Sequence, residues 1–521
     1  MAELISSLIA LVLTLWIVGA VLRASGLWFP DFFKPGKGKD PSPVGNLGAV
    51  LFAPLGSLAK WAWKAATGAG GEGARFMGFF ERSSILSPSN KGFVVDGVSK
   101  RLSPDNSFRN LAVVATTGAG KTAGFILPNI LRLDGCSMVI ADPSGSLFQR
   151  TSGDLEARGY KVRVINPSDP SSSDLYNPIA RARTHTEIAE IAHILVRTAN
   201  PGAGKPGADS FWTDGAEEII RTLIRVLKRY PDPACHNLAN LHYLLNAFGD
   251  GTGLNRFVAD YADDETYHVF KGFVSQSANT MQGHLSTAKT ALKMLADPDV
   301  ARLTAGESFD FAELRERKTA LFLVFPQNKV SYYSFLMNLL YSQLFHFCLD
   351  DSALSPESLP IYFLLDEFGH ATVPEFDAIV TTTRQRRIAI AIVLQAISQL
   401  ETRYGRAAAE TILNGGVASR LFFSGMDIGT AQMLERTVGT RRREVRDSED
   451  RLHLKDDALI TAAGLRTMPD NQVLYLFANK APAILKLTPY YEQSDLVRRT
   501  KAPPAKVGPF DDERIRYVDI G

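Results

Sequence analysis

The stretch Leu111–Thr122 (LAVVATTGAGKT) places glycines, a lysine and a threonine in the order that suits binding of a polyphosphate. Its apolar run predicts a buried β-strand, and its glycines predict a turn that leads onto the N-terminus of a helix. Backbone N–H groups in this turn would point at an anion, to which Lys121 adds a positive charge. The hydroxyl of Thr122 would bind Mg²⁺. We therefore expect ATP phosphates to be held by Thr117, Gly118, Ala119, Gly120, Lys121 and Thr122.

This loop departs from the G-x-x-x-x-G-K-[ST] pattern at its first position, where Ala115 replaces glycine. Alanine can adopt the extended dihedral angles of a strand end, so only a positive φ would be hindered there. A chance match in a loop is the alternative. The strand before the motif and the helix after it favour the phosphate-binding interpretation.

An acidic pair, Asp366 and Glu367, ends the apolar run LPIYFLLDE. A carboxylate at the carboxyl end of a buried parallel strand is where nucleotide-bound Mg²⁺ lies in phosphate-loop folds. We expect Asp366 to hold the metal through its water shell and Glu367 to act as the general base on the attacking water. An ordinary exit from a strand is the alternative, and the upstream phosphate loop argues against it.

Further candidates flank the next apolar strand. Gln395 follows it and could sense a γ-phosphate or orient water, or could have only a turn role. Arg384, Arg386 and Arg387 precede it. An arginine donated to the γ-phosphate of a neighbouring subunit would stabilise transition-state charge, although most surface arginines are merely solvated. We expect Arg384 to be the arginine with this role.

The elements that would position these residues alternate between strands and helices, which indicates a parallel α/β sheet. Predicted strands are FVVD (93–96), 111–114, 137–141, 161–165, 319–325, 359–365, 388–394 and 417–423. Between about 181 and 303 the strand signal disappears. A capping box at Thr184 and Glu187 and an apolar stripe over 216–227 predict helices there. The segment 201–208 (PGAGKPGA) has no strand before it and is interpreted as a linker.

The 521-residue chain has room for several domains, and its formal charge of +2 neither supports nor excludes a nucleic-acid partner. Cys136, Cys235 and Cys348 fit no disulfide or zinc pattern, which indicates a reducing compartment. The uncharged run 4–22 predicts a transmembrane helix, with a signal peptide as the alternative. A second span is predicted at 44–66. With one span or two, the rest of the chain would be cytosolic.

Taken together, the motifs resemble the type IV secretion coupling proteins, the TraG/TraD-like conjugative ATPases. The resemblance rests on the order of TTGAGKT, ADPSGS, YNPI, SFWTDGAEEII, LLDEFGH and VLQAISQL after hydrophobic N-terminal segments. It implies an inner-membrane anchor (1–80), a RecA-like nucleotide-binding domain (81–180 and 304–491), an all-helical insertion (181–303) and a tail (492–521). It also implies a homo-hexameric ring that uses ATP and Mg²⁺ to move DNA, a relaxase or effector cargo into the secretion channel.

Three residues depart from the family pattern. Many members have D-P-K-G-E where this chain has Asp142 to Ser146, so Ser144 and Ser146 replace a cation and a carboxylate, and Ala115 is the third. Two other functions stay open. One is a septal DNA pump resembling FtsK, and the other is a nucleotide-binding docking platform without processive work. The run 441–451 (RRREVRDSEDR) is interpreted as a solvated helix or insertion, with an arginine face turned toward phosphate as the alternative.

Overall fold

The structure is a computed structural model that describes residues 73–202, 210–248, 253–368, 373–446, 452–507 and 515–521. The predicted spans 4–22 and 44–66 lie outside these residues, as does most of the predicted linker at 201–208. Within the described ranges, every helix is too short or too polar to cross a bilayer.

The centre of the described chain is a nine-stranded sheet in the order β13-β12-β9-β3-β8-β7-β4-β6-β5. Its strands are β3 (Leu111–Val114), β4 (Ser137–Ala141), β5 (Lys161–Ile165), β6 (Thr319–Leu323), β7 (Ile361–Leu365), β8 (Ile388–Leu394), β9 (Ser419–Phe423), β12 (Gln472–Phe477) and β13 (Ala483–Lys486). The predicted α/β class is confirmed. The sheet is mixed rather than wholly parallel, because β12 and β13 join its edge antiparallel. In the predicted FVVD strand, Val94 makes only an isolated bridge to Arg101.

The central strands are buried on both faces, which explains their continuous apolar runs. Phe363 of β7 stacks on Phe345 of α16 (Val330–Leu349) at 4.7 Å between ring centroids. Its neighbour Tyr362 points to the opposite face and contacts Phe93 at 5.0 Å. That second face is covered by α5 (Leu127–Arg132) and α6 (Ser146–Ala157). Successive side chains of a strand point to opposite faces of the sheet, so each strand residue belongs to one of two separate hydrophobic cores.

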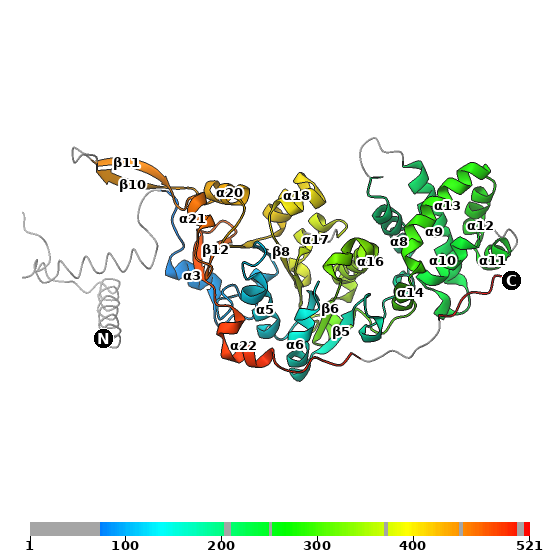
Figure 1. Cartoon of the computed structure of the whole chain (residues 1–521), viewed down its shortest axis with the longest axis horizontal. Coiled ribbons are helices and arrows are strands. Elements are labelled where there is room, and N and C mark those ends of the chain that lie inside the picture. The colour runs from blue at the N-terminus through cyan, green and yellow to red at the C-terminus, as the bar shows by residue number, and fades with distance from the viewer. Residues whose placement is uncertain (1–72, 203–209, 249–252, 369–372, 447–451, 508–514) are drawn as a thin grey trace, which may run out of the picture. The chain divides into compact units, whose positions relative to one another are not determined.

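The residues between β5 and β6 contain the green helices of Figure 1. Thr184 caps α8 with the predicted capping box, accepting from the N–H of Glu187 while Glu187 accepts from the N–H of Thr184. The predicted stripe of α9 is buried from Ala216 to Leu227. These helices are α7 (Pro178–Arg181), α8 (His185–Ala199), α9 (Phe211–Arg229), α10 (Leu238–Asn246), α11 (Gly253–Tyr261), α12 (Asp264–Val274), α13 (Ala278–Leu292) and α14 (Pro298–Leu303).

The described part of the run 441–451, residues 441–446, belongs to a strand rather than a helix. Strands β10 (Thr440–Arg446) and β11 (Leu452–Ala458) pair antiparallel, drawn in orange in Figure 1. The register places Arg441 opposite Asp457 and Arg442 opposite Asp456, with an Arg442–Asp456 ion pair of 3.5 Å. Cross-strand pairs of opposite charge favour a hairpin, and this pairing cannot be seen in the arginine run alone.

Shorter elements complete the described chain: α3 (Phe79–Ile85), β1 (Leu86–Ser87), β2 (Arg101–Leu102), α4 (Pro104–Ser107), α15 (Glu313–Glu316), α17 (Phe376–Thr382), α18 (Ser398–Tyr404), α19 (Arg406–Glu410), α20 (Ile428–Val438), α21 (Ala462–Arg466) and α22 (Ser494–Arg499). The last of these packs on α6, where Arg499 pairs with Asp154 at 2.6 Å. Farther along the chain, the backbone of Arg516 and Val518 is hydrogen-bonded to Asn240 of α10.

Asn110 joins β3 to its neighbours. It is buried with a φ of 58°, its side-chain oxygen accepts from the N–H of Ile390, and its amide nitrogen lies within 3.0 Å of the Val380 and Gly416 carbonyls. Asn110→Ala is expected to lower the free energy of unfolding by about 3 kcal/mol, because buried backbone groups lose partners and alanine disfavours positive φ. Urea unfolding measures the loss. Asn110→Gly loses the same side-chain hydrogen bonds but tolerates a positive φ, so its stability should fall between those of wild type and Asn110→Ala. An alanine variant as stable as wild type would contradict the argument.

A second bond joins α16 to α8. His346 Nδ1 lies 3.1 Å from Glu190 Oε2, and this hydrogen bond raises the pKa of His346 above its usual value. The stability from a raised histidine pKa is complete below the unfolded-state pKa and is lost as pH rises through the folded-state pKa. His346→Gln should therefore lower the melting temperature at about pH 5.5 but not at about pH 9, with a cost under about 1 kcal/mol because the ring is half exposed. Equal losses at both pH values would contradict this.

Candidate nucleotide-binding site

The phosphate loop leaves β3 at the carboxyl edge of the sheet and enters a helical turn, Thr122–Ile126, that continues into α5. Gly118 and Gly120 have φ of 83° and 84°, a conformation that glycine adopts readily and other residues rarely do. A Cβ at either position would meet open space. The glycines are therefore required by the shape of the backbone rather than by crowding.

The acidic pair lies directly beside this loop. Lys121 Nζ is 3.9 Å from Asp366 Oδ1 and 3.5 Å from Glu367 Oε1. The Thr122 hydroxyl donates to Asp366 Oδ2 at 3.4 Å. Residues separated by more than 240 positions in the sequence thus meet at one sheet edge, because β3 and β7 both run parallel to β8 and end at its carboxyl edge.

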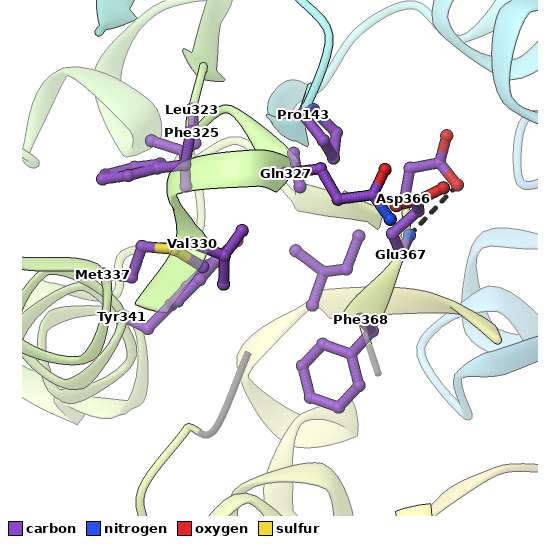
Figure 2. A pocket seen from close by; sticks show the side chains of 12 residues that line it. Pro143, Leu323, Phe325, Gln327, Val330, Met337, Tyr341, Asp366, Glu367 and Phe368 are labelled. Atoms are coloured by element: carbon purple, nitrogen blue, oxygen red, sulfur yellow. Dashed lines mark hydrogen bonds between the residues drawn. The ribbon is translucent and has the colours of Figure 1, made fainter. Parts of the chain in front are cut away.

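Burial changes the electrostatics of this pair. It raises the pKa of the Asp366 carboxyl above its usual value, although the Lys121 ammonium acts in the opposite direction. Behind the carboxylates lies a small apolar cavity of about 30 Å³. Figure 2 shows Asp366 and Glu367 at one side of it, joined by the hydrogen bond from the Glu367 N–H to Asp366 Oδ1, and Val330, Met337 and Tyr341 at the other. The carboxylates therefore have an apolar side and a polar side.

Glu367 has an unusual backbone. Its φ is 56°, in the left-handed region that residues other than glycine, asparagine and aspartate seldom occupy. Strain of this kind persists where the surroundings impose it, and it concentrates at functional sites. Here the residue directly follows β7 and turns its side chain back toward Lys121.

On the polar side, a cavity of about 560 Å³ opens between the loop and the acidic pair. Asp142 forms part of its wall and accepts from the N–H of Phe148 at 2.8 Å, so it caps the start of α6. Burial raises the pKa of the Asp142 carboxyl. The remaining lining includes Lys121, Thr122, Ser144, Ser146, Gln327, Asn328, Asp366 and Glu367. The cavity has the size and the mixture of donors and acceptors that suit a small polar ligand.

Two of the lining residues, Gln327 and Asn328, were not singled out from the sequence. They follow β6, so they reach the cavity by the same strand-end position as Asp142 and Asp366. The polar pair after the apolar run TALFLVFP was the available signal. Gln395 occupies the corresponding position after β8, whose Leu394 carbonyl accepts from the N–H of Ala115.

Arg384 lies elsewhere, before β8 and thus at the amino edge of the sheet. It pairs with Asp105 at 2.9 Å, and both side chains are more than half exposed. Arg386 and Arg387 are bound within the chain to the segment after α16, through Asp351 and Pro356. A cavity of about 300 Å³ at this edge collects Arg109, Arg384 and Arg420. Arg109 and Arg420 were not predicted, because nothing in their sequence context links them to Arg384.

Among the described residues, no three or more histidine, cysteine, aspartate or glutamate side chains are arranged as a metal site of their own. Thr122 and Asp366 supply a hydroxyl and a carboxylate, the hard oxygen donors that Mg²⁺ prefers. Mg²⁺ is usually held by one or two such groups together with phosphate oxygens and water. This donor set therefore fits a nucleotide-bound Mg²⁺ rather than a metal held by protein alone.

Comparison with known proteins identifies the relatives of this chain. Residues 82–508 match the model of the family described as type IV secretory system conjugative DNA transfer. The chain belongs to this family. The predicted resemblance to type IV secretion coupling proteins is thereby confirmed.

Curated relatives of this chain include VirD4 of Rhizobium radiobacter, 25% identical over 408 residues that cover 74% of this chain and 57% of VirD4. VirD4 of Agrobacterium fabrum is 26% identical over 408 residues, with 74% and 59% covered. The aligned region thus spans less than two thirds of the length of these relatives.

Solved structures of the conjugative coupling protein TrwB share the fold. The unbound form of TrwB lacking 70 N-terminal residues has a TM-score of 0.61 at 20% identity, covering 80% of this chain and 93% of that one. TrwB in complex with ADP and Mg²⁺ has a TM-score of 0.61 at 18% identity, covering 81% and 95%. At this level of identity the likeness concerns the fold.

The departures of this family member from the common motifs have local explanations. Ala115 is buried at the end of β3 and is not among the residues of positive φ, so a methyl group is accommodated. Ser144 and Ser146 hydrogen-bond each other at 2.6 Å beside Asp142. The two serines therefore keep a polar wall without the charges found in many members.

Proposed function

We propose that this protein is an ATPase that couples substrates to a type IV secretion channel and drives their transfer. The proposal rests on the contacts between the phosphate loop and the acidic pair. Lys121 Nζ lies within 4 Å of carboxylate oxygens of Asp366 and Glu367, and the Thr122 hydroxyl donates a hydrogen bond to Asp366. The ADP and Mg²⁺ bound to the similarly folded TrwB support it. The roles of individual residues, the assembly and the partners are parts of the same proposal.

The loop residues Thr117 to Thr122 hold the phosphates of ATP through backbone N–H groups and the Lys121 ammonium. Thr122 and Asp366 hold Mg²⁺, which when bound supplies positive charge to the phosphates. Glu367 accepts a proton from water, since its carboxylate faces the cavity from the strand edge. Gln395, at the neighbouring strand end, senses the terminal phosphate.

The remaining parts of the proposal concern location and partners. The chain would be anchored in the bacterial inner membrane by segments 4–22 and 44–66, with the described residues in the cytoplasm. A homo-hexamer would pass DNA through contacts to phosphates without reading sequence, as single-strand channels do. The helical insertion would receive a relaxase or effector cargo, and channel proteins would accept it.

ATP hydrolysis by the purified protein tests the proposal. Wild type is expected to hydrolyse ATP, with and without DNA, at least about a hundredfold faster than Lys121→Ala, because the variant loses a preorganised charge on the phosphates. Lys318→Ala is the matched control, since Lys318 is a lysine paired with Asp134 outside the site. Equal rates in wild type and Lys121→Ala under every condition would refute the motor.

A further inference from the structure

The segment Arg516–Gly521 lies against the helical insertion and belongs to no helix, turn or strand. Its burial alternates: Val518 is 3% exposed and Ile520 is half-buried, whereas Tyr517 and Asp519 are exposed. Val518 belongs to the same hydrophobic core as α9 and α10. The segment therefore packs as a docked peptide does, with the Val518 side chain inserted and the Ile520 side chain partly inserted.

One side chain holds its backbone. The Asn240 amide nitrogen donates to the Arg516 carbonyl at 2.8 Å, and the Asn240 amide oxygen accepts from the Val518 N–H at 2.8 Å. Asn240 is fully buried, and its second amide hydrogen is directed to Asn237 Oδ1 at 3.0 Å. A carboxamide that bonds both the carbonyl of one residue and the N–H of the next but one recognises an extended main chain whatever its side chains.

The neighbouring residues fit the segment along its length. Tyr517 packs edge-on against Tyr243 of α10 at 5.4 Å, and Arg516 lies 3.7 Å from Asp232. Gly253 begins α11 where a Cβ would lie only 2.6 Å from the Ile520 carbonyl, so the helix must start with glycine for the segment to pass. We call the surface formed by Asp232, Asn240, Tyr243 and Gly253 the Asn240 site.

We propose that the Asn240 site binds extended peptides and that the chain's own Arg516–Gly521 is its resting occupant. The main-chain bonds supply affinity without specificity, and the insertion of two alternate side chains supplies the selection. One fully buried side chain and two hydrogen bonds to a single residue give the segment only a modest affinity for the site. Because the segment is covalently attached, its local concentration is high, and it therefore occupies the site. An outside peptide of the same chemistry displaces it.

The chemistry of the occupant defines the outside partner. It is an extended protein segment with a β-branched aliphatic residue at the Val518 position, an apolar residue two places later and an aromatic residue just before. Asp232 adds a preference for a basic residue at the start. The inference that such a segment belongs to a cargo protein rests on the proposed function. The inference that the Asn240 site binds a peptide is independent of that function.

Fluorescence anisotropy of a labelled synthetic peptide with the sequence of residues 515–521 tests the site in the absence of nucleotide. Val518→Asp should expel the attached segment, because a charge is not tolerated in an apolar pocket. The labelled peptide is then expected to bind this variant about tenfold or more tightly than wild type, where the attached segment competes. Asn240→Ala combined with Val518→Asp should abolish the binding.

Matched variants separate recognition from damage. Asp519→Asn alters an exposed residue of the same segment and should bind the peptide as weakly as wild type. A chain that stops at Val507 releases the site without any substitution and should bind as Val518→Asp does. A peptide with aspartate in place of the valine should bind neither the Val518→Asp variant nor the chain that stops at Val507.

The proposal is overturned if the released proteins bind the peptide no more tightly than wild type, or if the aspartate peptide binds equally well. Lys121→Ala should leave peptide binding unchanged. Failure of the peptide site is therefore distinguishable from failure of the ATPase.

Discussion

Replacing Glu367 by glutamine is expected to reduce ATP hydrolysis by about 10²- to 10⁴-fold, the usual contribution of a positioned general base, while nucleotide binding persists. The substitution keeps the size of the side chain and its reach toward Lys121, but it removes the site that accepts a proton. Single-turnover hydrolysis and binding of a fluorescent ATP analogue measure the two effects separately. The expected combination is a large loss of rate with an affinity within about threefold of wild type.

The control for this prediction is Glu375→Gln. Glu375 is also a glutamate of left-handed backbone, with φ of 53°, but it directly precedes α17 and its side chain is exposed. Glu375→Gln thus removes the charge of a glutamate with the same kind of backbone strain, but away from the cavity. This variant should hydrolyse ATP at the wild-type rate. If Glu367→Gln hydrolyses ATP at the wild-type rate, another group takes the proton and Glu367 is only a structural partner of Lys121.

The strands that carry the site were predictable because burial on both faces leaves little choice of residue. The predicted ranges 137–141, 161–165 and 388–394 coincide with β4, β5 and β8. The phosphate loop that follows β3 and the carboxylate that follows β7 were expected to meet, and the parallel strands bring Lys121 within 4 Å of Asp366. Here a local pattern was sufficient, since the rule that parallel strands end at one edge supplies the long-range contact.

Other features depend on partners that no local pattern reveals. The β12 strand contains the polar Gln472 and joins β9 from a region of mixed composition, and its antiparallel direction is fixed by pairing alone. The cavity at the amino edge is lined by Arg109, which precedes β3, and by Arg420 of β9, and these two strands are neighbours only in the sheet. The segment Arg516–Gly521 was expected only as part of the tail 492–521, because its buried Val518 and half-buried Ile520 have no periodic context in the sequence.

The second large expected effect is a loss of ATP hydrolysis on replacing Arg384, which lines the amino-edge cavity. If this arginine acts on the nucleotide of a neighbouring subunit, Arg384→Ala should lower hydrolysis by about 10³-fold, the lower range for arginines supplied in trans. The loss should appear only at protein concentrations where wild type is oligomeric, because the carboxyl-edge site of the same chain lies at the other end of the strands. Hydrolysis rate measured against protein concentration, alongside sedimentation velocity, gives this comparison.

Arg384→Ala should hardly change the free energy of unfolding. This result would distinguish a role toward a neighbouring subunit from a structural role within the chain. The Arg384–Asp105 pair is exposed on both sides, and such pairs contribute about 0 to 1 kcal/mol. Arg406→Ala is the matched control, since Arg406 forms a similar exposed pair with Glu410 at 3.1 Å and should leave hydrolysis unchanged. Asp105→Ala frees Arg384 from its partner in the chain and should not reduce the rate. A rate that is equally low for Arg384→Ala and Asp105→Ala would show that the intact pair matters, and the arginine would then have no role toward a neighbour.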